Sequence, residues 1–284
     1  MANESLNLWL EDLYGDQAGL KLKLRECLHS STSPFQRIAV FDSHAFGKVL
    51  TLGGAIALTD FDEALYSECL VHPSLSVSKS AEHVLILGGG DGGVTREVLR
   101  YPAVKRVTVV EIDREVVEVC RTFFPTAASC LNDPRVELVI DDAHRYLRDC
   151  PHQFDVIVVD ACELTNTASD AFHVLTFADS VFRRLKAGGL LVAPLGCPTF
   201  SADECRATLR TLERFPHTQV YLMNIPSFPG GQWAVARCLN GPAVSDKVEL
   251  QTWHRSLRCW HPGLQASMFT LPRNVESQLG LLKP

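Results

Sequence analysis

The sequence predicts an α/β protein in which a small antiparallel β domain precedes an open, mostly parallel sheet. Apolar and polar residues alternate over residues 20–60, which is typical of half-buried strands. From His83 onward, short apolar runs alternate with helical segments, which is typical of a parallel sheet covered by helices. The glycine-rich stretch "GGGDGG" directly follows the first of these runs, as it does in nucleotide-binding α/β folds.

The small β domain is expected over residues 1–65. Its strands are indicated by "LKLKL" from Leu20, "RIAVF" from Arg37 and "GKVLTLGGAIAL" from Gly47. The two glycines at residues 53–54 predict a hairpin turn, because glycine adopts the backbone conformations that tight turns require. Strands joined by such short turns pair in the antiparallel direction.

The larger domain is expected over residues 66–284, and a helix lies at its start. The stretch "DEALYSECLVHPSLSV" has the spacing of an amphipathic helix, with Leu65, Cys69 and Leu70 facing inward. Pro73 is expected to disturb this helix, because proline has no backbone N–H to donate.

The remaining elements follow the rhythm of alternating strands and helices. Strands are expected at residues 83–88, 106–112, 135–140, 154–160 and 189–195. Helices are expected near residues 93–100, 114–123, 143–149, 171–186 and 202–214. The last apolar runs, "QVYLMNI" from Gln219 and "QWAVARCL" from Gln232, are joined by a short loop rich in proline and glycine. They predict a terminal hairpin with an antiparallel final strand.

The composition excludes several classes of protein. With 284 residues, 46% hydrophobic and 21% charged residues, the chain is long and apolar enough to bury a large core, and disorder is excluded. A formal net charge of −6 disfavours a non-specific nucleic-acid binder and suits a cationic small molecule better. We therefore expect a small-molecule substrate and no nucleic acid as a partner.

The cysteines, histidines and N-terminus argue for a cytoplasmic protein without a metal. The ten cysteines are scattered without a CxxC pair, so we interpret them as reduced thiols. The ten histidines are also dispersed, and we expect no metal site. The start "MANESLNLWLEDLYG" lacks the basic residues of a signal peptide, and no apolar run reaches the length of a membrane span.

An aspartate in the glycine loop indicates the charge of the ligand. Gly88, Gly90 and Gly93 satisfy G-x-G-x-x-G between a predicted strand and a predicted helix, which indicates a nucleotide-type site. Asp91 would repel the phosphates of a dinucleotide in a poorly screened crevice, whereas it would attract a cationic S-adenosyl sulfonium. In the alternative interpretation, Asp91 only caps the following helix.

Further acidic residues follow the predicted strands, at the sheet edge where such ligands bind. Glu111 ends the second strand, 23 residues after Gly88, where a carboxylate can accept both ribose hydroxyls of an adenosine. Asp142 ends the third strand, within reach of an adenine amino group, and Asp160 ends the fourth, nearest to the expected reacting group. Any one of these acids could instead be a helix cap or a solvated loop residue.

The chain resembles the spermidine synthase family of polyamine aminopropyltransferases along almost its whole length. The resemblance is carried by "NLWLEDLYG", "LHSSTSPFQ", "ALTDFDEALYSE", "GGGDGG", "VEID", "NDPRVELVIDDA", "FDVIVVD", "IPSFPGGQ" and "WHPGLQASMFTLP". It implies a Rossmann-like, class I methyltransferase-type sheet behind the small β domain. It also implies decarboxylated S-adenosylmethionine as co-substrate, an amine as acceptor, and a homodimer or homotetramer formed through the N-terminal sheet.

The resemblance implies site residues on the nucleoside side. Gln36 and Asp91 would contact the aminopropyl end of the nucleoside, and Glu111 would contact the ribose. Asp142 and the backbone of Ala143 would hold the adenine, while Gly88 and Gly90 shape the loop.

On the acceptor side, the resemblance makes Asp160 the carboxylate that orients and deprotonates the attacking amine, with Tyr66 helping to hold that amine. The family pattern changes on this side. The family's D-S-S-D-P becomes "DACELTNTAS", which puts Glu163 in place of the second aspartate, and its I-P-T-Y-P becomes "IPSFP", which leaves Phe228 without a hydroxyl. The family's Q-G-E is replaced by residues 194–196, "PLG".

Three functions remain open because the changes all fall on the acceptor side. The first is an aminopropyltransferase with an altered acceptor pocket, for which putrescine and other amines are both open as acceptors. The second is a small-molecule methyltransferase that uses intact S-adenosylmethionine on the same scaffold. The third is a catalytically silent nucleoside-binding or scaffold protein.

Overall fold

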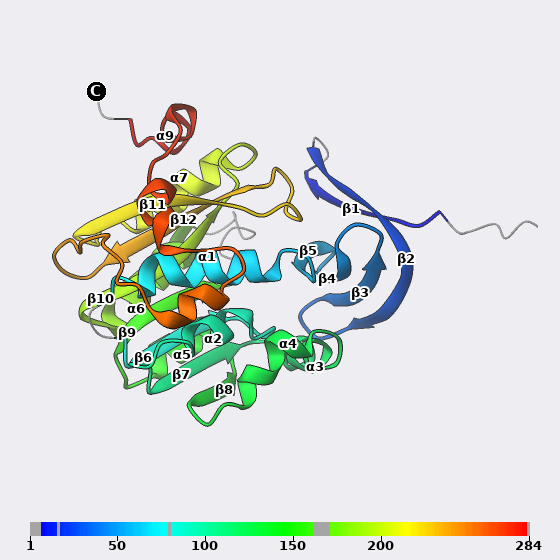
Figure 1. Cartoon of the computed structure of the whole chain (residues 1–284), viewed down its shortest axis with the longest axis horizontal. Helices are drawn as coiled ribbons and strands as arrows, with labels where there is room; N and C mark the ends of the chain where they lie inside the picture. Colours follow the sequence, from blue (N-terminus) through cyan, green and yellow to red (C-terminus); the bar gives the residue numbers. More distant parts are fainter. Residues whose placement is uncertain (1–6, 16–17, 79–80, 162–170, 283–284) are drawn as a thin grey trace, which may run out of the picture.

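Two β-sheets lie at opposite ends of the long axis of the molecule (Figure 1). The computed structural model describes residues 7–15, 18–78, 81–161 and 171–282. Glu163 of the predicted acceptor site lies outside these residues.

The N-terminal sheet is antiparallel throughout and has the strand order β1-β2-β3-β4-β5. Its strands are β1 (Trp9–Tyr14), β2 (Ala18–Thr32), β3 (Arg37–Ser43), β4 (Gly47–Leu52) and β5 (Ala55–Thr59). The predicted hairpin turn is confirmed, since Gly53 and Gly54 connect β4 to β5 with φ of 61° and 100°. Strand β1 was missed, because "WLEDLY" alternates too weakly to stand out from a loop.

One face of this small sheet packs on the larger domain. Ile38, Val40 and Leu50 share a buried cluster with Val116 and Cys120 of helix α3 (Arg114–Phe123). A boundary near residue 65 between the two domains stays a prediction.

The second sheet has seven strands in the order β11-β12-β10-β9-β6-β7-β8. They are β6 (His83–Gly88), β7 (Arg106–Glu111), β8 (Val136–Ile140), β9 (Phe154–Asp160), β10 (Leu185–Gly196), β11 (His217–Asn224) and β12 (Gln232–Leu239). The predicted antiparallel final strand is confirmed, since β12 pairs antiparallel with both β10 and β11. The chain proceeds outward from β6 to β8 and returns to β9 on the other side, so β6 and β9 flank a topological switch point. Ligands bind open α/β sheets at such points.

Helices cover both faces of this sheet (Figure 1). They are α1 (Glu63–Leu75), α2 (Gly93–Val98), α3 (Arg114–Phe123), α4 (Pro125–Ala128), α5 (Ala143–Asp149), α6 (Ala171–Arg184), α7 (Ala202–Thr211), α8 (Gln265–Met268) and α9 (Arg273–Leu279). Strand β6 is buried on both sides: Val84 and Ile86 belong to one apolar cluster, and Leu85 and Leu87 belong to the other. Within the described ranges, no helix is long and apolar enough to span a membrane.

Helix α1 continues through Pro73, which corrects the expected disturbance. Proline cannot donate to the carbonyl of Cys69, four residues earlier. The hydroxyl of Tyr221 donates to that carbonyl instead, at 3.0 Å. The Pro73 carbonyl accepts from Arg237 and from Gln265, both at 2.8 Å. Side chains from distant segments therefore satisfy the backbone groups around the proline.

Candidate active site

The glycine loop folds directly over the end of β9. Gly88 pairs with Asp160 in the sheet register, and Gly89 N–H donates to the Asp160 carbonyl at 3.1 Å. Gly88 has φ of 87°, and a Cβ there would lie 2.1 Å from the same carbonyl oxygen. A Cβ at Gly89 would lie 3.0 Å from Asp160 Oδ2. Residues 88 and 89 approach Asp160 this closely because glycine has no side chain.

Glu111 lies at the end of β7 and is held by backbone groups. Its Oε2 accepts from Gly90 N–H at 3.1 Å, and its Oε1 accepts from Asp113 N–H at 2.9 Å. The residue is only 8% exposed, and burial raises the pKa of its carboxyl against the opposing effect of the two N–H donors. Each carboxylate oxygen has a second lone pair, so Glu111 can still accept from ligand hydroxyls.

Asp91 supports the start of α2. Its Oδ1 accepts from Gly93 N–H at 2.7 Å, so the capping interaction expected in the alternative interpretation is present. Burial raises the pKa of the Asp91 carboxyl, the Gly93 N–H lowers it, and the nearby charge of Glu63 raises it further. The capping interaction and a ligand contact are compatible, since only Oδ1 accepts from Gly93.

Asp160 ends β9 with one carboxylate oxygen held and the other oriented toward the loop. Tyr66 of α1 donates from its hydroxyl to Oδ1 at 3.0 Å. Oδ2 is shielded from solvent and has no hydrogen-bond partner within the described part of the chain. Burial is the main cause that raises the pKa of Asp160 well above its usual range. The charge of Asp91 adds to this, and the Tyr66 hydroxyl opposes it.

Gln36, from the loop before β3, lies beside Asp113. Its Nε2 is 3.4 Å from Asp113 Oδ2, which also accepts from the Ser33 hydroxyl at 2.6 Å. Asp113 caps α3 by accepting from Glu115 N–H. Gln36 therefore lies close to Glu111, because Asp113 also donates its N–H to the Glu111 carboxylate. The contact of Gln36 with the aminopropyl end of the nucleoside stays a prediction. The role of Asp113 in joining the two domains was missed, because capping aspartates are common at strand ends.

A cavity of about 930 Å³ opens at the predicted adenine end. Its lining includes Phe35, Ile112, Asp141 and Asp142. The exposed Asp142 caps α5 by accepting from Arg145 N–H at 2.8 Å.

The cavity meets the start of α5. Ala143 is the first residue of this helix, where backbone N–H groups lack partners within the helix and are available to a ligand. The adenine roles of Asp142 and Ala143 stay predictions.

A series of aromatic rings in contact with one another begins at Tyr66, which donates to Asp160. We call Tyr14, Tyr66, Phe200, Phe228 and Trp233 the aromatic wall. Ring centroids are 5.8 Å apart for Tyr66 and Phe228, 5.1 Å for Phe228 and Trp233, 6.5 Å for Trp233 and Tyr14, and 5.5 Å for Tyr14 and Phe200. The sequence did not predict Tyr14 as a site residue, because strand β1 was itself missed. Phe200 and Trp233 belong to no motif or regular spacing that would mark them as site residues.

The predicted site residues in the described chain thus form three groups. Around the glycine loop lie Gly88, Gly90, Asp91, Glu111, Asp160 and Tyr66. Asp142 lines the cavity and precedes Ala143 at the start of α5, and Phe228 lies in the aromatic wall next to Tyr66. Gln36 lies outside these groups, beside Asp113. Among the described residues, no group of three His, Cys, Asp or Glu side chains could hold a metal ion.

These features define a class of protein. A class I methyltransferase-type sheet, a glycine loop with an internal carboxylate, and a second carboxylate after β7 are the parts of a nucleoside-dependent group transferase.

Comparisons with known proteins name the family. Residues 8–60 match the spermidine synthase tetramerisation domain, and residues 63–247 match the spermine/spermidine synthase domain. The polyamine aminopropyltransferase of Agathobacter rectalis is 34% identical over 280 residues, which cover 96% of this chain and 98% of that protein. The enzyme of the same name from Moorella thermoacetica is 34% identical and covers 96% of each chain. The chain therefore belongs to the spermine/spermidine synthase family and is an aminopropyltransferase.

Solved structures give the same result. A spermidine synthase in complex with the transition-state analogue AdoDATO superimposes with a TM-score of 0.90 at 29% identity, over 99% of each chain. The spermidine synthase of Thermotoga maritima superimposes with a TM-score of 0.88 at 29% identity, over 99% of this chain and 98% of that one.

Proposed function

We propose that the chain transfers the aminopropyl group of decarboxylated S-adenosylmethionine to a primary amine and releases methylthioadenosine. The observation that carries this proposal is the position of Asp160 at the switch point, with Oδ1 held by Tyr66 and Oδ2 without a partner in the described chain. A carboxylate fixed in this way can accept an N–H from an attacking amine and hold the nitrogen in one place.

The proposed reaction is an in-line displacement. The lone pair of the uncharged amine attacks the methylene carbon next to the sulfonium, and a C–N bond forms. The C–S bond breaks with its electron pair on sulfur, so the neutral thioether methylthioadenosine leaves. The new ammonium passes its proton to Asp160 or to water. The raised pKa of Asp160 makes it a better proton acceptor than an ordinary aspartate.

The charges around the loop favour the decarboxylated donor. Asp91 raises the pKa of Glu111, and both Asp91 and Glu111 raise the pKa of Asp160, so these carboxylates interact at close range. They attract a sulfonium and an ammonium, but they repel the α-carboxylate that intact S-adenosylmethionine carries. In the proposed arrangement Asp91 and Gln36 face the aminopropyl end, Glu111 binds the ribose, and Asp142 with Ala143 binds the adenine.

The acceptor is proposed to be less polar at its far end than putrescine. The described acceptor side presents the rings of the aromatic wall, and Leu195 is fully buried where the family pattern has a polar stretch. Phe228 provides no hydroxyl. A second ammonium buried without a polar partner would cost about 1–3 kcal/mol or more. A monoamine with an alkyl tail avoids this cost.

The test supplies the purified protein with decarboxylated or intact S-adenosylmethionine and with either putrescine or butylamine. The proposal predicts methylthioadenosine with the decarboxylated donor, and a higher kcat/KM for butylamine than for putrescine. Release of S-adenosylhomocysteine from the intact donor would instead identify a methyltransferase. Binding of the nucleoside without turnover of any amine would identify a silent nucleoside-binding protein.

We also propose that the chain forms a homodimer or homotetramer through the N-terminal sheet. The match of residues 8–60 to a tetramerisation domain supports this. Exposed Trp9, Leu13, Leu28 and Phe35 on or beside β1 and β2 provide apolar surface for the contact. The mass of the protein in solution, measured by light scattering, tests the proposal.

A further inference from the structure

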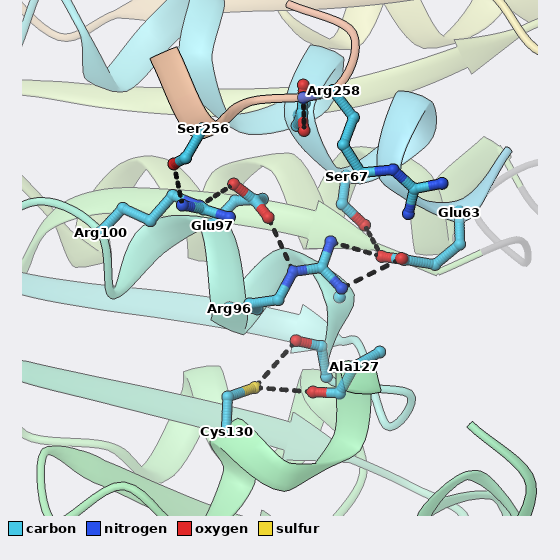
Figure 2. Close-up of polar contacts among 12 residues, drawn as sticks. Glu63, Ser67, Arg96, Glu97, Arg100, Ala127, Cys130, Ser256 and Arg258 are labelled. Atoms are coloured by element: carbon cyan, nitrogen blue, oxygen red, sulfur yellow. Dashed lines mark hydrogen bonds and ion pairs between the residues drawn. The ribbon is translucent and has the colours of Figure 1, made fainter. Parts of the chain in front are cut away.

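Glu63 and Arg96 form a bidentate ion pair beside the glycine loop (Figure 2). Arg96 of α2 donates to the two carboxylate oxygens of Glu63, at 3.0 and 2.8 Å. Ser67 Oγ donates to Glu63 Oε1 at 2.9 Å. The Glu63 and Arg96 side chains are only 11% and 19% exposed. A shielded, bidentate pair of this kind fixes the orientation of both side chains.

The Glu63–Arg96 pair lies close to Asp91, the carboxylate proposed to bind the donor. A Cβ at Gly93 would lie 2.5 Å from Glu63 Oε1 and 2.9 Å from Asp91 Oδ1, so both carboxylates contact the same loop residue. Two carboxylates at this spacing repel each other. Glu63 raises the pKa of Asp91 and Arg96 lowers it, in addition to the larger effect of burial.

Arg96 is itself anchored away from the loop. Its Nε donates to Glu97 Oε1 at 2.7 Å, and Glu97 also accepts from Arg100 Nε at 2.5 Å. Arg100 in turn donates to Ser256 Oγ at 3.1 Å (Figure 2). Glu97 and these two arginines thus form a charge network. Of the two arginines, Arg96 is the one with a contact to Glu63 in the described part of the chain.

We propose that the Glu63–Arg96 pair is a positioning device for the donor, in which each charge cancels the other so that Asp91 alone faces the donor's primary ammonium. This inference rests on the proposed function and on the assignment of Asp91 to the aminopropyl end. Without Glu63, Arg96 still contacts Glu97, but Arg100 shares that carboxylate, so the network gains a net positive charge near Asp91 that repels the incoming ammonium. When both residues are neutral, the net charge around Asp91 is the same as in the wild type.

The experiment measures the Kd of two nucleosides by calorimetry. Decarboxylated S-adenosylmethionine carries the ammonium, and methylthioadenosine lacks it. Glu63→Gln is expected to weaken binding of the charged donor about tenfold, the size of one charge-assisted hydrogen bond, and to leave methylthioadenosine binding unchanged. The double variant Glu63→Gln/Arg96→Gln is expected to recover donor binding to within about threefold of the wild type.

Arg100→Gln is the matched control. It removes an arginine from the same network and the same partner, Glu97, without a contact to Glu63, so donor binding should not change. If Glu63→Gln fails to fold, Glu63→Asp replaces it. Its shorter carboxylate retreats from Arg96, and the donor's Kd should rise about threefold.

A merely structural pair gives a different pattern. If Glu63 and Arg96 only tie α1 to α2, the double variant binds the donor no better than Glu63→Gln, and methylthioadenosine binding falls as far as donor binding. Either result overturns the inference, as does unchanged donor binding by Glu63→Gln. A wild-type protein that binds no decarboxylated donor overturns the proposed function as well.

Discussion

The donor and acceptor sides of the candidate active site are held in place by different means. On the donor side, backbone N–H groups of the glycine loop hold the carboxylates of Asp91 and Glu111. On the proposed acceptor side, the Asp160 carboxylate accepts from the Tyr66 hydroxyl, and the side-chain rings of the aromatic wall continue from Tyr66. A backbone contact survives most substitutions, whereas each ring can be exchanged without moving the chain. The acceptor preference of this fold can therefore change while nucleoside binding stays the same.

Asp160→Asn is expected to have the largest effect on activity. An amide keeps the shape of the side chain but cannot accept the amine proton, so kcat should fall about 10²–10⁴-fold. The Kd of methylthioadenosine should stay within about twofold, because the substitution leaves the loop backbone unchanged. Substantial residual kcat in this variant would contradict the role of Asp160.

The same variant should be more stable than the wild type at alkaline pH. In the folded protein, the pKa of Asp160 is well above that of an aspartate in the unfolded chain. At pH values between these two pKa values, the folded state binds more protons than the unfolded state. Stability therefore falls as the pH rises toward the folded pKa, and the amide has no such loss. The gain in Tm should be larger at pH 8 than at pH 5.

Gly88→Ala tests whether the donor side depends on backbone geometry. The added Cβ would lie 2.1 Å from the Asp160 carbonyl oxygen, and φ is 87°. The loop must move, so we expect methylthioadenosine to bind about a hundredfold more weakly and Tm to fall. Gly188→Ala is the matched control, because φ is 78° there but no atom lies within 4 Å of the new Cβ. Equal losses of Tm in both variants would show that φ alone matters.

Most of the fold follows from the sequence because its signals are local. In β6, β7 and β9, strongly apolar segments end at Gly88, Glu111 and Asp160, close to the predicted boundaries. Two features escaped local reasoning. Strand β1 has little alternation, and the helix continues through Pro73 because Tyr221, which lies 148 residues later in the chain, donates to the freed carbonyl. Such compensation from a distant segment leaves no pattern near the proline.

The candidate site also has features that the sequence predicts and features that it does not. Carboxylates at strand ends are visible in the sequence, because strand ends of a parallel sheet share one edge. The partners that set their properties are not visible: Tyr66 reaches Asp160 across 94 positions, and Arg96 reaches Glu63 across 33. The aromatic wall joins β1 to β12 through Tyr14 and Trp233, so no spacing rule could assemble it.

Tyr66→Phe tests the contact between the two sides of the site. The Tyr66 hydroxyl lowers the pKa of Asp160, while burial, Asp91, Glu111 and Glu63 raise it. Removing the hydroxyl should raise that pKa further. Because Asp160 must be ionised to accept the amine proton, the acidic limb of the pH–kcat profile should move to higher pH. At pH 6 we expect about a tenfold loss of kcat.

The pH–kcat profiles of Tyr66→Phe and the wild type are measured with the same amine. The titration of the amine affects both profiles equally, so it does not contribute to the difference between them. Donor KM should be unchanged, because Tyr66 contacts Asp160 rather than the glycine loop among the contacts described. A uniform loss of kcat at all pH values would mean that Tyr66 acts only through packing.

Phe228→Tyr is the mildest test of the difference between the two sides. Phe228 is 8% exposed and packs between Tyr66 and Trp233. An added hydroxyl there gives the acceptor side a further polar partner, at the position where the family pattern has a tyrosine. One such hydrogen bond is worth about 0.5–1.5 kcal/mol, so the ratio of kcat/KM for putrescine to that for butylamine should rise about threefold to tenfold. The Kd of methylthioadenosine should not change, since the donor side is held by backbone contacts. If the ratio stays constant while kcat falls for both amines, the ring at this position serves packing, and acceptor preference is set elsewhere.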